Sequence, residues 1–379
     1  MNALDRLLEF PRFGNSGVNE RMEKLCSSLM SKTWWQTASC IKVAGSNGKG
    51  TTATIMSLMS QNLDKKVGLY TSPHLLRVNE RIQINNSEIS NEDLEISLSW
   101  ALGQASGLEG VGRFEILTTA CLFYFAQNNV DIAIMEVGLG GRFDPVRIAP
   151  GIISVLTSID LEHTQILGDN LATITQEKAA ICKKGDCLIS AVKDITSLLP
   201  DGVASIEVIK FDPFSSNHAL AQHAIKHHFN LPHLPDAIKP FQIPGRMHCL
   251  STDPLVYVDV AHSPAAVKTV LQNLKGKRLC LICGSRNDKD MQAIADIFDS
   301  YLDHVIAFNP EGDMMPTDDI LKPFEGVRKD EAFTASQAIE LGKAHLQPNG
   351  VILCLGGFAI VSHIMALFDG TPTPNIVRI

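Results

Sequence analysis

Short apolar runs alternate with longer amphipathic stretches along most of this chain. In the first half, the runs rich in β-branched and other apolar side chains are typical of buried strands and cover residues 41–45, 65–70, 130–138, 151–159 and 187–190. The stretches between them that are typical of helices cover residues 51–63, 116–129 and 172–184. Continuous apolar strands that alternate with helices predict a mostly parallel sheet covered on both faces.

A second set of the same kind begins after Pro244-Gly245. Its predicted strands cover residues 255–261, 278–284, 304–309 and 351–357, with helices near 264–274 and 334–345. The 379 residues also exceed what one core usually organises. We therefore predict an α/β protein with a P-loop-type domain, residues 1–244, and a smaller Rossmann-like domain, residues 245–379.

Two segments invite other interpretations. Residues 200–244 carry several prolines and four histidines between His218 and His228; we interpret them as a helix with a solvated histidine face that leads into a linker, rather than a metal site. The segment from Gly350 to Phe368 resembles a membrane span, but Gly356-Gly357 interrupts it. A buried strand at 351–355, a glycine turn and a helix explain this segment better.

Composition narrows the class of function. A net charge of −8 and a pI near 5.8 argue against non-specific nucleic-acid or anionic-membrane binding. Nine scattered cysteines and an N-terminus without a signal peptide's apolar region predict a cytoplasmic protein in a reducing compartment. Cys280 and Cys283 lie three residues apart in a predicted strand, so we expect them on opposite faces, as neither a metal nor a redox pair.

The residues from Gly45 to Thr52, GSNGKGTT, follow the first strand and open a helix. Glycines allow consecutive backbone N–H groups to turn toward phosphate oxygens, and the helix N-terminus adds partial positive charge. Lys49 would reach the terminal phosphates of ATP, and a hydroxyl just after it would hold Mg²⁺. The common loop has no residue between the lysine and that hydroxyl, whereas Gly50 stands between Lys49 and Thr51 here.

Further candidates follow later strands of the first set. Glu136 ends the apolar run VDIAIM, where a carboxylate at the carboxyl end of a parallel strand is suited to a nucleotide-bound Mg²⁺. Gly138-Leu-Gly-Gly141 comes next and would allow close approach to a ligand. His163 follows the next strand at the same end of the sheet.

These motifs carry a family resemblance. GSNGKGTT, TSPH with NER, RFE, EVGLGGRFD, SIDLEHTQILG with EKAAICKKG, and DVAH occur in one order between residue 16 and the GGF near the end. Together they resemble the bacterial dihydrofolate synthase/folylpolyglutamate synthase family of the Mur ligase superfamily. TSPHL with NER, combined with EVGLGGRFD, separates this family from the cell-wall ligases.

The resemblance implies roles residue by residue. It implies ATP and two Mg²⁺ ions, with metal ligands at Thr51, Glu136, His163 and Lys178, the last of which would carry a carbamate. It implies catalytic roles for Lys49, Lys178, His163 and His262. The residues implied for ATP are Asn47, Gly48, Lys49, Gly50, Thr51 and Thr52, joined from the interdomain side by Asn217, Arg246 and Asp259. The residues implied for the pterin substrate are Ser72, His74, Arg81, Gly112, Arg113, Phe114, Glu115, Phe143, Asp144 and Pro145.

The implied reaction is a ligation through an acyl phosphate. A carboxylate of dihydropteroate or of a reduced folate would attack the γ-phosphate of ATP, and the amine of L-glutamate, bound on the C-terminal domain, would then displace phosphate. Domain closure would exclude water from the acyl phosphate. Small-molecule partners, no nucleic acid, no membrane and a monomer are expected.

The chain departs from the family pattern at three places. Ser263 stands where AHNP is usual, Pro145-Val-Arg147 stands where Ala-Thr-Asn is usual, and the stretch between Lys193 and Asn217 is short. We expect the catalytic face to be retained, because the missing part lies away from the metal motifs. The alternatives are a Mur-type peptidoglycan precursor ligase, a degenerate ATP-binding paralogue, and a switch protein, although Asn287-Asp-Lys-Asp290 has the wrong order for guanine recognition.

Overall fold

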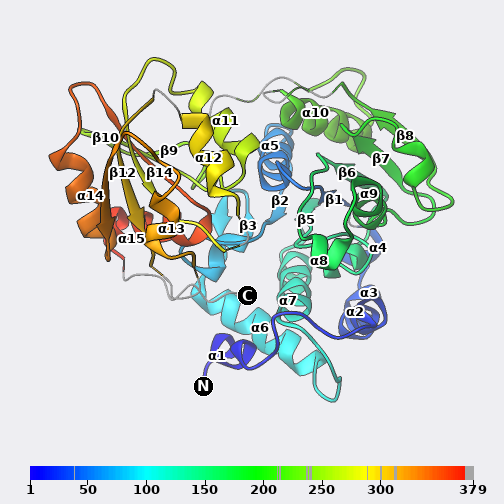
Figure 1. Cartoon of the computed structure of the whole chain (residues 1–379). Coiled ribbons are helices and arrows are strands. Elements are labelled where there is room, and N and C mark those ends of the chain that lie inside the picture. The colour runs from blue at the N-terminus through cyan, green and yellow to red at the C-terminus, as the bar shows by residue number, and fades with distance from the viewer. Residues whose placement is uncertain are drawn as a thin grey trace. The chain divides into compact units, whose positions relative to one another are not determined.

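The structure is a computed structural model of the chain and describes residues 1–371, except 38, 211, 213–214, 236–237, 239–240, 288, 299–300 and 311–313. The described residues form two compact units (Figure 1). Unit 1 holds the residues up to Ile238 except Leu75–Arg77. Unit 2 holds Leu75–Arg77 and the residues from Phe241 to Thr371.

Unit 1 is built on an eight-stranded sheet in the order β4-β3-β2-β5-β1-β6-β7-β8. Its strands are β1 (Ser39–Ala44), β2 (Val67–Tyr70), β3 (Ile82–Ile84), β4 (Ser87–Glu88), β5 (Ile132–Glu136), β6 (Ile153–Leu156), β7 (Cys187–Ser190) and β8 (Ser205–Val208). All neighbouring pairs from β2 to β8 are parallel, and the β3–β4 hairpin adds an antiparallel edge. The five strands predicted from apolar runs are all among the parallel ones.

Helices cover both faces of this sheet. On one face, Met56 of α5 (Lys49–Gln61) and Leu220 of α10 (Ser216–Phe229) share a core with Ile41 and Val43 of β1. On the other face, α7 (Arg113–Gln127) packs so tightly that a Cβ on Gly68 of β2 would lie 2.9 Å from the ring of Phe125. The apolar alternation of the strands is therefore buried on both sides, as expected for a parallel sheet.

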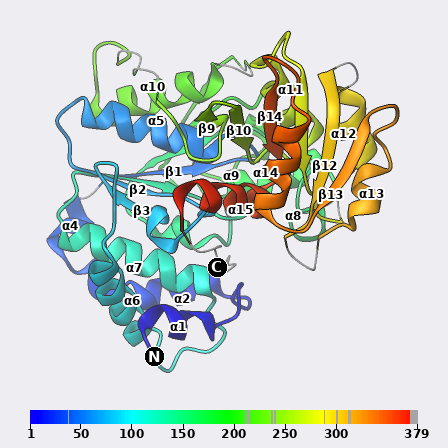
Figure 2. The same ribbon diagram turned by 90° about the vertical axis from the view of Figure 1, so that its left-hand side faces the viewer.

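The remaining helices that the structure describes in unit 1 are α1 (Ala3–Leu8), α2 (Val18–Leu25), α3 (Ser27–Met30), α4 (Thr33–Thr37), α6 (Asn91–Gln104), α8 (Thr164–Leu167) and α9 (Leu171–Ala179). Of these, α1, α2 and α6 pack against α7. Figure 2 shows α1, α2, α6 and α7 gathered together, and α6 contacts both α1 and α7.

Unit 2 has a six-stranded sheet in the order β13-β12-β11-β14-β10-β9. Its strands are β9 (His248–Thr252), β10 (Leu255–Asp259), β11 (Leu279–Cys283), β12 (Leu302–Phe308), β13 (Arg328–Ala332) and β14 (Val351–Leu355). All pairs are parallel except β9 with β10. The fold class is thus confirmed: two α/β sheets dominated by parallel strands.

Helices α11 (Pro264–Gln272), α12 (Met291–Phe298) and α13 (Thr317–Leu321) pack on one face of this sheet. Helices α14 (Ala335–Ala344) and α15 (Phe358–Asp369) pack on the other, and Figure 1 shows α14 across the sheet from α11 and α12. Cys280 belongs to the core under α14 and α15, whereas Cys283 belongs to the core under α11 and α12. The prediction that these two cysteines face opposite sides is confirmed.

The elements missed by the sequence pattern are short or polar. Strand β13 reads RKDEA and lies at the edge of its sheet, and β8 is an edge strand whose residues are largely exposed. An edge strand needs only one hydrogen-bonding neighbour and little burial, so its apolar signature is weak. The histidines of α10 lie on a helix as expected, where His223 Nδ1 is 2.5 Å from Glu207 Oε1 and His228 Nδ1 is 3.2 Å from Ser39 Oγ.

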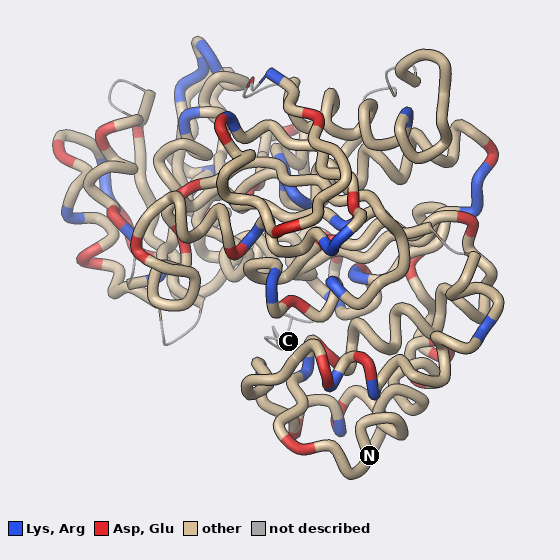
Figure 3. Tube along the Cα trace, turned by 90° about the vertical axis from the view of Figure 1, so that its right-hand side faces the viewer, with Lys and Arg blue, Asp and Glu red and all other residues tan. Residues whose placement is uncertain are grey.

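No helix among the described residues is long and apolar enough to cross a membrane, and the segment after Gly350 forms β14, a glycine turn and α15 as predicted. Charges of both signs are interspersed along the trace in Figure 3, without a long run of one sign.

Candidate functional site

The loop after β1 is tied to the loop after the neighbouring strand β6. Ser46 N donates to Ser158 O at 2.7 Å, Asn47 N donates to Ser158 Oγ at 3.0 Å, and Asp160 N donates to Ser46 Oγ at 2.9 Å. Gly45 has φ +142°, and a Cβ there would lie 2.0 Å from Thr157 Oγ1. Gly45 is thus required because the ends of β1 and β6 approach each other too closely for a side chain at this position.

Asn217 lies beside this loop although 165 residues separate it from Thr52. Thr52 Oγ1 is 3.2 Å from Asn217 Oδ1. Gly48 adopts φ +82°, and a Cβ there would lie 2.4 Å from the same Oδ1. The packing of α10 on α5 brings Asn217 to the start of α5, even though the stretch before it is short.

Two lysines converge on one backbone carbonyl. Lys49 Nζ donates to Gly45 O at 2.9 Å and to Ser46 O at 3.1 Å, while Lys178 Nζ donates to Gly45 O at 3.1 Å. Lys178 is 2% exposed and also forms an ion pair with Glu162 Oε1 at 2.8 Å. Burial, followed by the nearby charge of Lys49, lowers the pKa of Lys178. Sequence reasoning did not single out Glu162, although it directly precedes His163 in the motif DLEH.

Glu136 lies next to the helix start that follows Lys49. Its carboxylate is buried and accepts a hydrogen bond from Ser72 N at 2.8 Å. A Cβ on Gly50 would lie 3.2 Å from Glu136 Oε2. The extra glycine of the loop therefore leaves room for this carboxylate, and Gly50, Ser72 and Glu136 are brought together.

His163 is exposed and begins the short helix α8 with a left-handed φ of +48°. Within the described part of the chain, no three His, Cys, Asp or Glu side chains are grouped to hold a metal ion. Mg²⁺ is usually held by one or two carboxylates together with phosphates and water rather than by an all-protein cage. The donor that fits this chemistry best is the Glu136 carboxylate beside the loop.

His74 and Arg81 form a buried pair. Arg81 Nε donates to His74 Nδ1 at 2.8 Å, and both residues are less than 10% exposed. Burial, followed by the charge of Arg81, lowers the pKa of His74 to about 3, so this imidazole is neutral and acts as an acceptor.

The stretch from Gly138 to Pro145 is organised by Asp144. The carboxylate of Asp144 accepts from the backbone N–H groups of Gly138, Leu139 and Val146 at 2.9–3.0 Å. Burial raises the pKa of Asp144 to about 6.

The glycines of this stretch approach protein atoms. A Cβ on Gly138 would lie 2.8 Å from the Phe114 ring, and one on Gly141 would lie 2.4 Å from Lys178 O. Phe143 is 58% exposed. Of the three predicted pterin contacts at 143–145, Phe143 is the one open to a ligand, because Asp144 and Pro145 are buried.

Gly112 to Glu115 begin α7 and hold the N-terminal segment. Glu115 accepts from Gly112 N at 2.8 Å and from Arg21 Nε at 2.8 Å. Arg113 Nε donates to Phe10 O at 2.6 Å. A Cβ on Gly14 would lie 2.0 Å from Glu115 Oε2. These bonds tie the start of α7 to the N-terminal segment, and Arg21 is a partner that sequence reasoning missed.

In unit 2, Asp259 organises the turns around it. Its buried carboxylate accepts from Met247 N at 2.7 Å and from Ala261 N at 2.8 Å. Burial raises the pKa of Asp259, opposed by these bonds and by Arg246. Arg246 is exposed, directly before Met247, so the structure brings the predicted pair Arg246 and Asp259 together.

His262 lies at a switch point of the sheet in unit 2. Strand β14 stands between β11 and β10, and the helix after β14 packs on the opposite face from the helices after its two neighbours. Ligands of open α/β sheets bind in the crevice that such a reversal creates. A small pocket lies there, lined by His262 together with Gly284, Ser285 and Gly356.

The helix ends around His262 differ in their capping. A Cβ on Gly357, the N-cap of α15, would lie 4.0 Å from His262 Cβ, and α15 has no side-chain cap. Ser263 instead caps α11 through Oγ, which accepts from Ala266 N at 3.4 Å. Serine and asparagine are equally good N-caps, so the departure at this position keeps the helix start.

Comparison with known proteins gives one family model: residues 245–358 match the Mur ligase, glutamate ligase domain. Among curated proteins, the chain is 28% identical over 365 residues to dihydrofolate synthase/folylpolyglutamate synthase of Escherichia coli, covering 86% of each chain.

Solved structures agree over nearly the full length. The chain matches E. coli FolC in complex with DHPP and ADP with a TM-score of 0.82, 25% identity and 98% coverage of both chains. It matches the bifunctional folylpolyglutamate synthase/dihydrofolate synthase of Yersinia pestis complexed with AMPPNP and Mn ion with a TM-score of 0.84 and 25% identity, covering 97% of this chain and 98% of that one.

Proposed function

We propose that this chain, which belongs to the Mur ligase superfamily and to its dihydrofolate synthase/folylpolyglutamate synthase family, is an ATP-dependent ligase that adds L-glutamate to dihydropteroate, to reduced folates, or to both. The observation that carries the proposal is the constellation at the carboxyl end of the sheet in unit 1. There, the GKGTT loop is flanked by the carboxylate of Glu136 and by the buried Lys178.

The two chemical steps place different demands on the chain. First, a carboxylate oxygen of the pterin substrate attacks the γ-phosphorus and ADP leaves. Then the neutral amine of L-glutamate attacks the acyl carbon, the bond to phosphate breaks, and the nitrogen loses a proton. Phosphoryl transfer depends mainly on positioning and charge stabilisation. Lys49 and the N–H groups at the start of α5 are suited to the phosphates.

A divalent cation fits the residues at the loop. Glu136 provides a buried carboxylate beside Gly50, and Thr51 provides a hydroxyl on the first turn of α5. Bound there, the cation would neutralise charge on the phosphoryl oxygens. We assign a second site to His163 and Lys178. The ammonium form of Lys178 cannot bind a metal, whereas its carbamate can, and a lowered pKa favours the neutral amine that adds CO₂.

We assign the pterin to the part of unit 1 formed by Ser72, His74 and Arg81 together with the stretches 112–115 and 143–145. The exposed ring of Phe143 is its most accessible member, and Phe114, which stacks on Tyr70 at 5.8 Å between ring centroids, supports the wall. Glu115, Asp144 and the His74–Arg81 pair hold this wall in place through the bonds described above.

We assign L-glutamate to unit 2, at the crevice beside His262. The uncapped N-terminus of α15 supplies backbone N–H groups and partial positive charge for a carboxylate. Arg246 and Asp259 are assigned to the nucleotide, by the family resemblance. We also propose that the chain acts as a monomer. We propose a reducing, cytoplasmic location as well, and the nine free cysteine thiols are consistent with it.

The test is ADP release from the purified chain with ATP, Mg²⁺ and L-glutamate, adding dihydropteroate or tetrahydrofolate in turn. Stimulation by either pterin is expected, and stimulation by a muramyl peptide instead would replace the proposal with a cell-wall ligase. Lys49→Ala should lower turnover about a hundredfold or more. The matched control Lys24→Ala, on the exposed side of α2, should leave the rate unchanged.

A further inference from the structure

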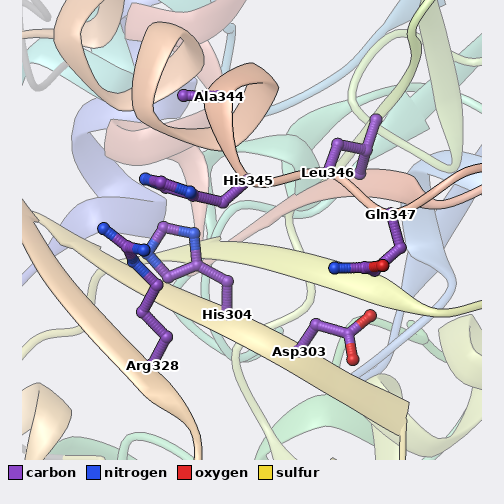
Figure 4. A pocket seen from close by; sticks show the side chains of 7 residues that line it. All are labelled: Asp303, His304, Arg328, Ala344, His345, Leu346 and Gln347. Atoms are coloured by element: carbon purple, nitrogen blue, oxygen red, sulfur yellow. The ribbon is translucent and has the colours of Figure 1, made fainter.

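A pocket of about 270 Å³ opens at the edge of unit 2 where its parallel strands begin. Asp303 and His304 come from the start of β12, Arg328 from the start of β13, and His345 and Gln347 from the segment after α14 (Figure 4). The crevice beside His262 lies at the carboxyl ends of β10, β11 and β14, on the opposite edge of the same sheet. The pocket is therefore separate from the proposed glutamate site.

The floor of the pocket is a buried, fully bonded imidazole. His304 is 1% exposed, its Nε2 lies 2.7 Å from Asp330 Oδ2, and its Nδ1 lies 3.7 Å from Cys280 Sγ. With Nε2–H donating to the carboxylate, Nδ1 accepts from the thiol. Both ring nitrogens of His304 are thus engaged within the protein, so this side chain forms a fixed floor of the pocket and does not itself bind a ligand.

The walls, in contrast, present polar groups that the protein does not use. Arg328 donates from Nε to Asp330 Oδ2 at 3.1 Å, while its Nη groups make no hydrogen bond to any described residue. The same holds for the ring nitrogens of His345 and the side-chain amide of Gln347, within the part of the chain that the structure describes. His345 contacts His304 edge to face, with 5.2 Å between ring centroids.

These groups are arranged by charge. Figure 4 shows Arg328 and His345 at one end of the pocket and Asp303 and Gln347 at the other. Both hydrogen bonds from Arg278 to Asp303 end on Oδ1, so Oδ2 is available to a donor. Ala344 and the C-cap His345 also line the pocket, so the negative end of the α14 dipole lies beside Arg328 and offsets part of its charge. One lining guanidinium and one lining carboxylate leave the pocket neutral but polarised.

We propose that this pocket binds a small zwitterion, an α-amino acid, with its carboxylate on Arg328 and His345 and its ammonium group on Asp303. A planar guanidinium matches a carboxylate through two parallel hydrogen bonds. A simple anion would gain from Arg328 but would face the Asp303 carboxylate, whereas a zwitterion has a group of opposite charge for each of the two residues. The volume corresponds to about nine water molecules at about 30 Å³ each, enough for an amino acid of moderate size.

The test uses the full chain and the ring ¹H–¹⁵N spectrum of its twelve histidines, with the His345 signal assigned through His345→Gln. The probes are L-alanine, N-acetyl-L-alanine, which lacks the ammonium charge, L-alaninamide, which lacks the carboxylate, and inorganic phosphate. L-alanine should shift the His345 signal saturably at millimolar concentrations, and the two blocked forms should bind at least about tenfold more weakly.

Variants separate this site from general effects. Arg328→Gln and Asp303→Asn should each weaken L-alanine binding about tenfold or more, and Gln347→Ala, an exposed position outside the ion pairs, should weaken it less. Lys329→Gln, one residue along β13 and on its other face, is the matched control and should bind normally.

No saturable shift with L-alanine up to about 50 mM would overturn the proposal, as would equal binding of phosphate or N-acetyl-L-alanine, which would indicate an anion site. Lys49→Ala should bind L-alanine like the parent chain, so failure of the ligase proposal and failure of this one are distinguishable.

Discussion

A Cβ on Gly50 would lie 3.2 Å from Glu136 Oε2, so the residue that separates Lys49 from Thr51 faces a buried carboxylate. Because Ser72 N holds that carboxylate at 2.8 Å, Glu136 has little freedom to withdraw. The presence of Gly50 between Lys49 and Thr51, where the common phosphate-binding loop has no residue, is thus explained by the carboxylate that lies beside it.

Gly50→Ala should displace the Glu136 carboxylate by a few tenths of an ångström without unfolding unit 1. Since small misplacements at a reacting centre cost rate steeply, turnover with ATP and pterin should fall about tenfold. The measurement is steady-state ADP release, with a thermal melt as the check on folding. Gly103→Ala, where an added Cβ meets nothing within 4 Å, is the control. Full activity in Gly50→Ala would contradict a role for Glu136 at the loop.

Asn217→Ala should weaken nucleotide binding about tenfold, because its amide oxygen accepts from Thr52 Oγ1 and lies against Gly48. Titration of the chain with ADP, followed by calorimetry, measures the effect. His218→Ala changes the next residue along α10, on another face of the helix, and should bind ADP normally. Equal affinities for the two variants would remove Asn217 from the nucleotide site.

Lys42→Met tests a buried ion pair beneath the sheet of unit 1. Lys42 is 0% exposed and lies 2.7 Å from Asp186 Oδ2, so its removal leaves a buried carboxylate and should cost about 3 kcal/mol of unfolding free energy. Fluorescence reports unit 1 alone, because Trp34, Trp35 and Trp100, the three tryptophans of the chain, all lie in it.

The control for that pair is Arg142→Met. It removes the more exposed pair with Glu177, which should change stability by less than about 1 kcal/mol. A similar loss in both variants would mean that burial does not set the energy of the Lys42–Asp186 pair.

His74→Gln should reduce the dependence of the unfolding free energy of unit 1 on pH in the acid range. The pKa of His74 is lowered to about 3, below the usual 6.5, so the unfolded chain binds one proton more than the folded chain between these values. Stability is therefore present above pH 6.5 and declines toward pH 3, with a slope of up to about 1.4 kcal/mol per pH unit. Urea unfolding by tryptophan fluorescence at several pH values measures this slope. An unchanged slope in His74→Gln would show that burial beside Arg81 does not keep this imidazole neutral in the folded chain.

Much of the fold follows from local pattern. The apolar runs predicted the parallel strands of both sheets that are buried on two faces, because continuous burial leaves a continuous apolar signature. The polar strand β13 was not predicted. Its strand conformation depends on backbone pairing with β12 and leaves no apolar pattern in its own residues. Likewise, Cys280 and Cys283 were placed on opposite faces by the strand period alone.

The sequence by itself determined the phosphate loop, the strand ends that flank it and the family motifs, because these depend on residues close together in the chain. Only the tertiary structure decided that Glu162 partners Lys178 and that Asn217 contacts Thr52 and Gly48. It also decided that Asp144 and Glu115 turn inward to accept from backbone N–H groups. A carboxylate looks the same in a motif whether it faces a ligand or its own backbone. Its direction depends on which distant helices and strands pack beside it.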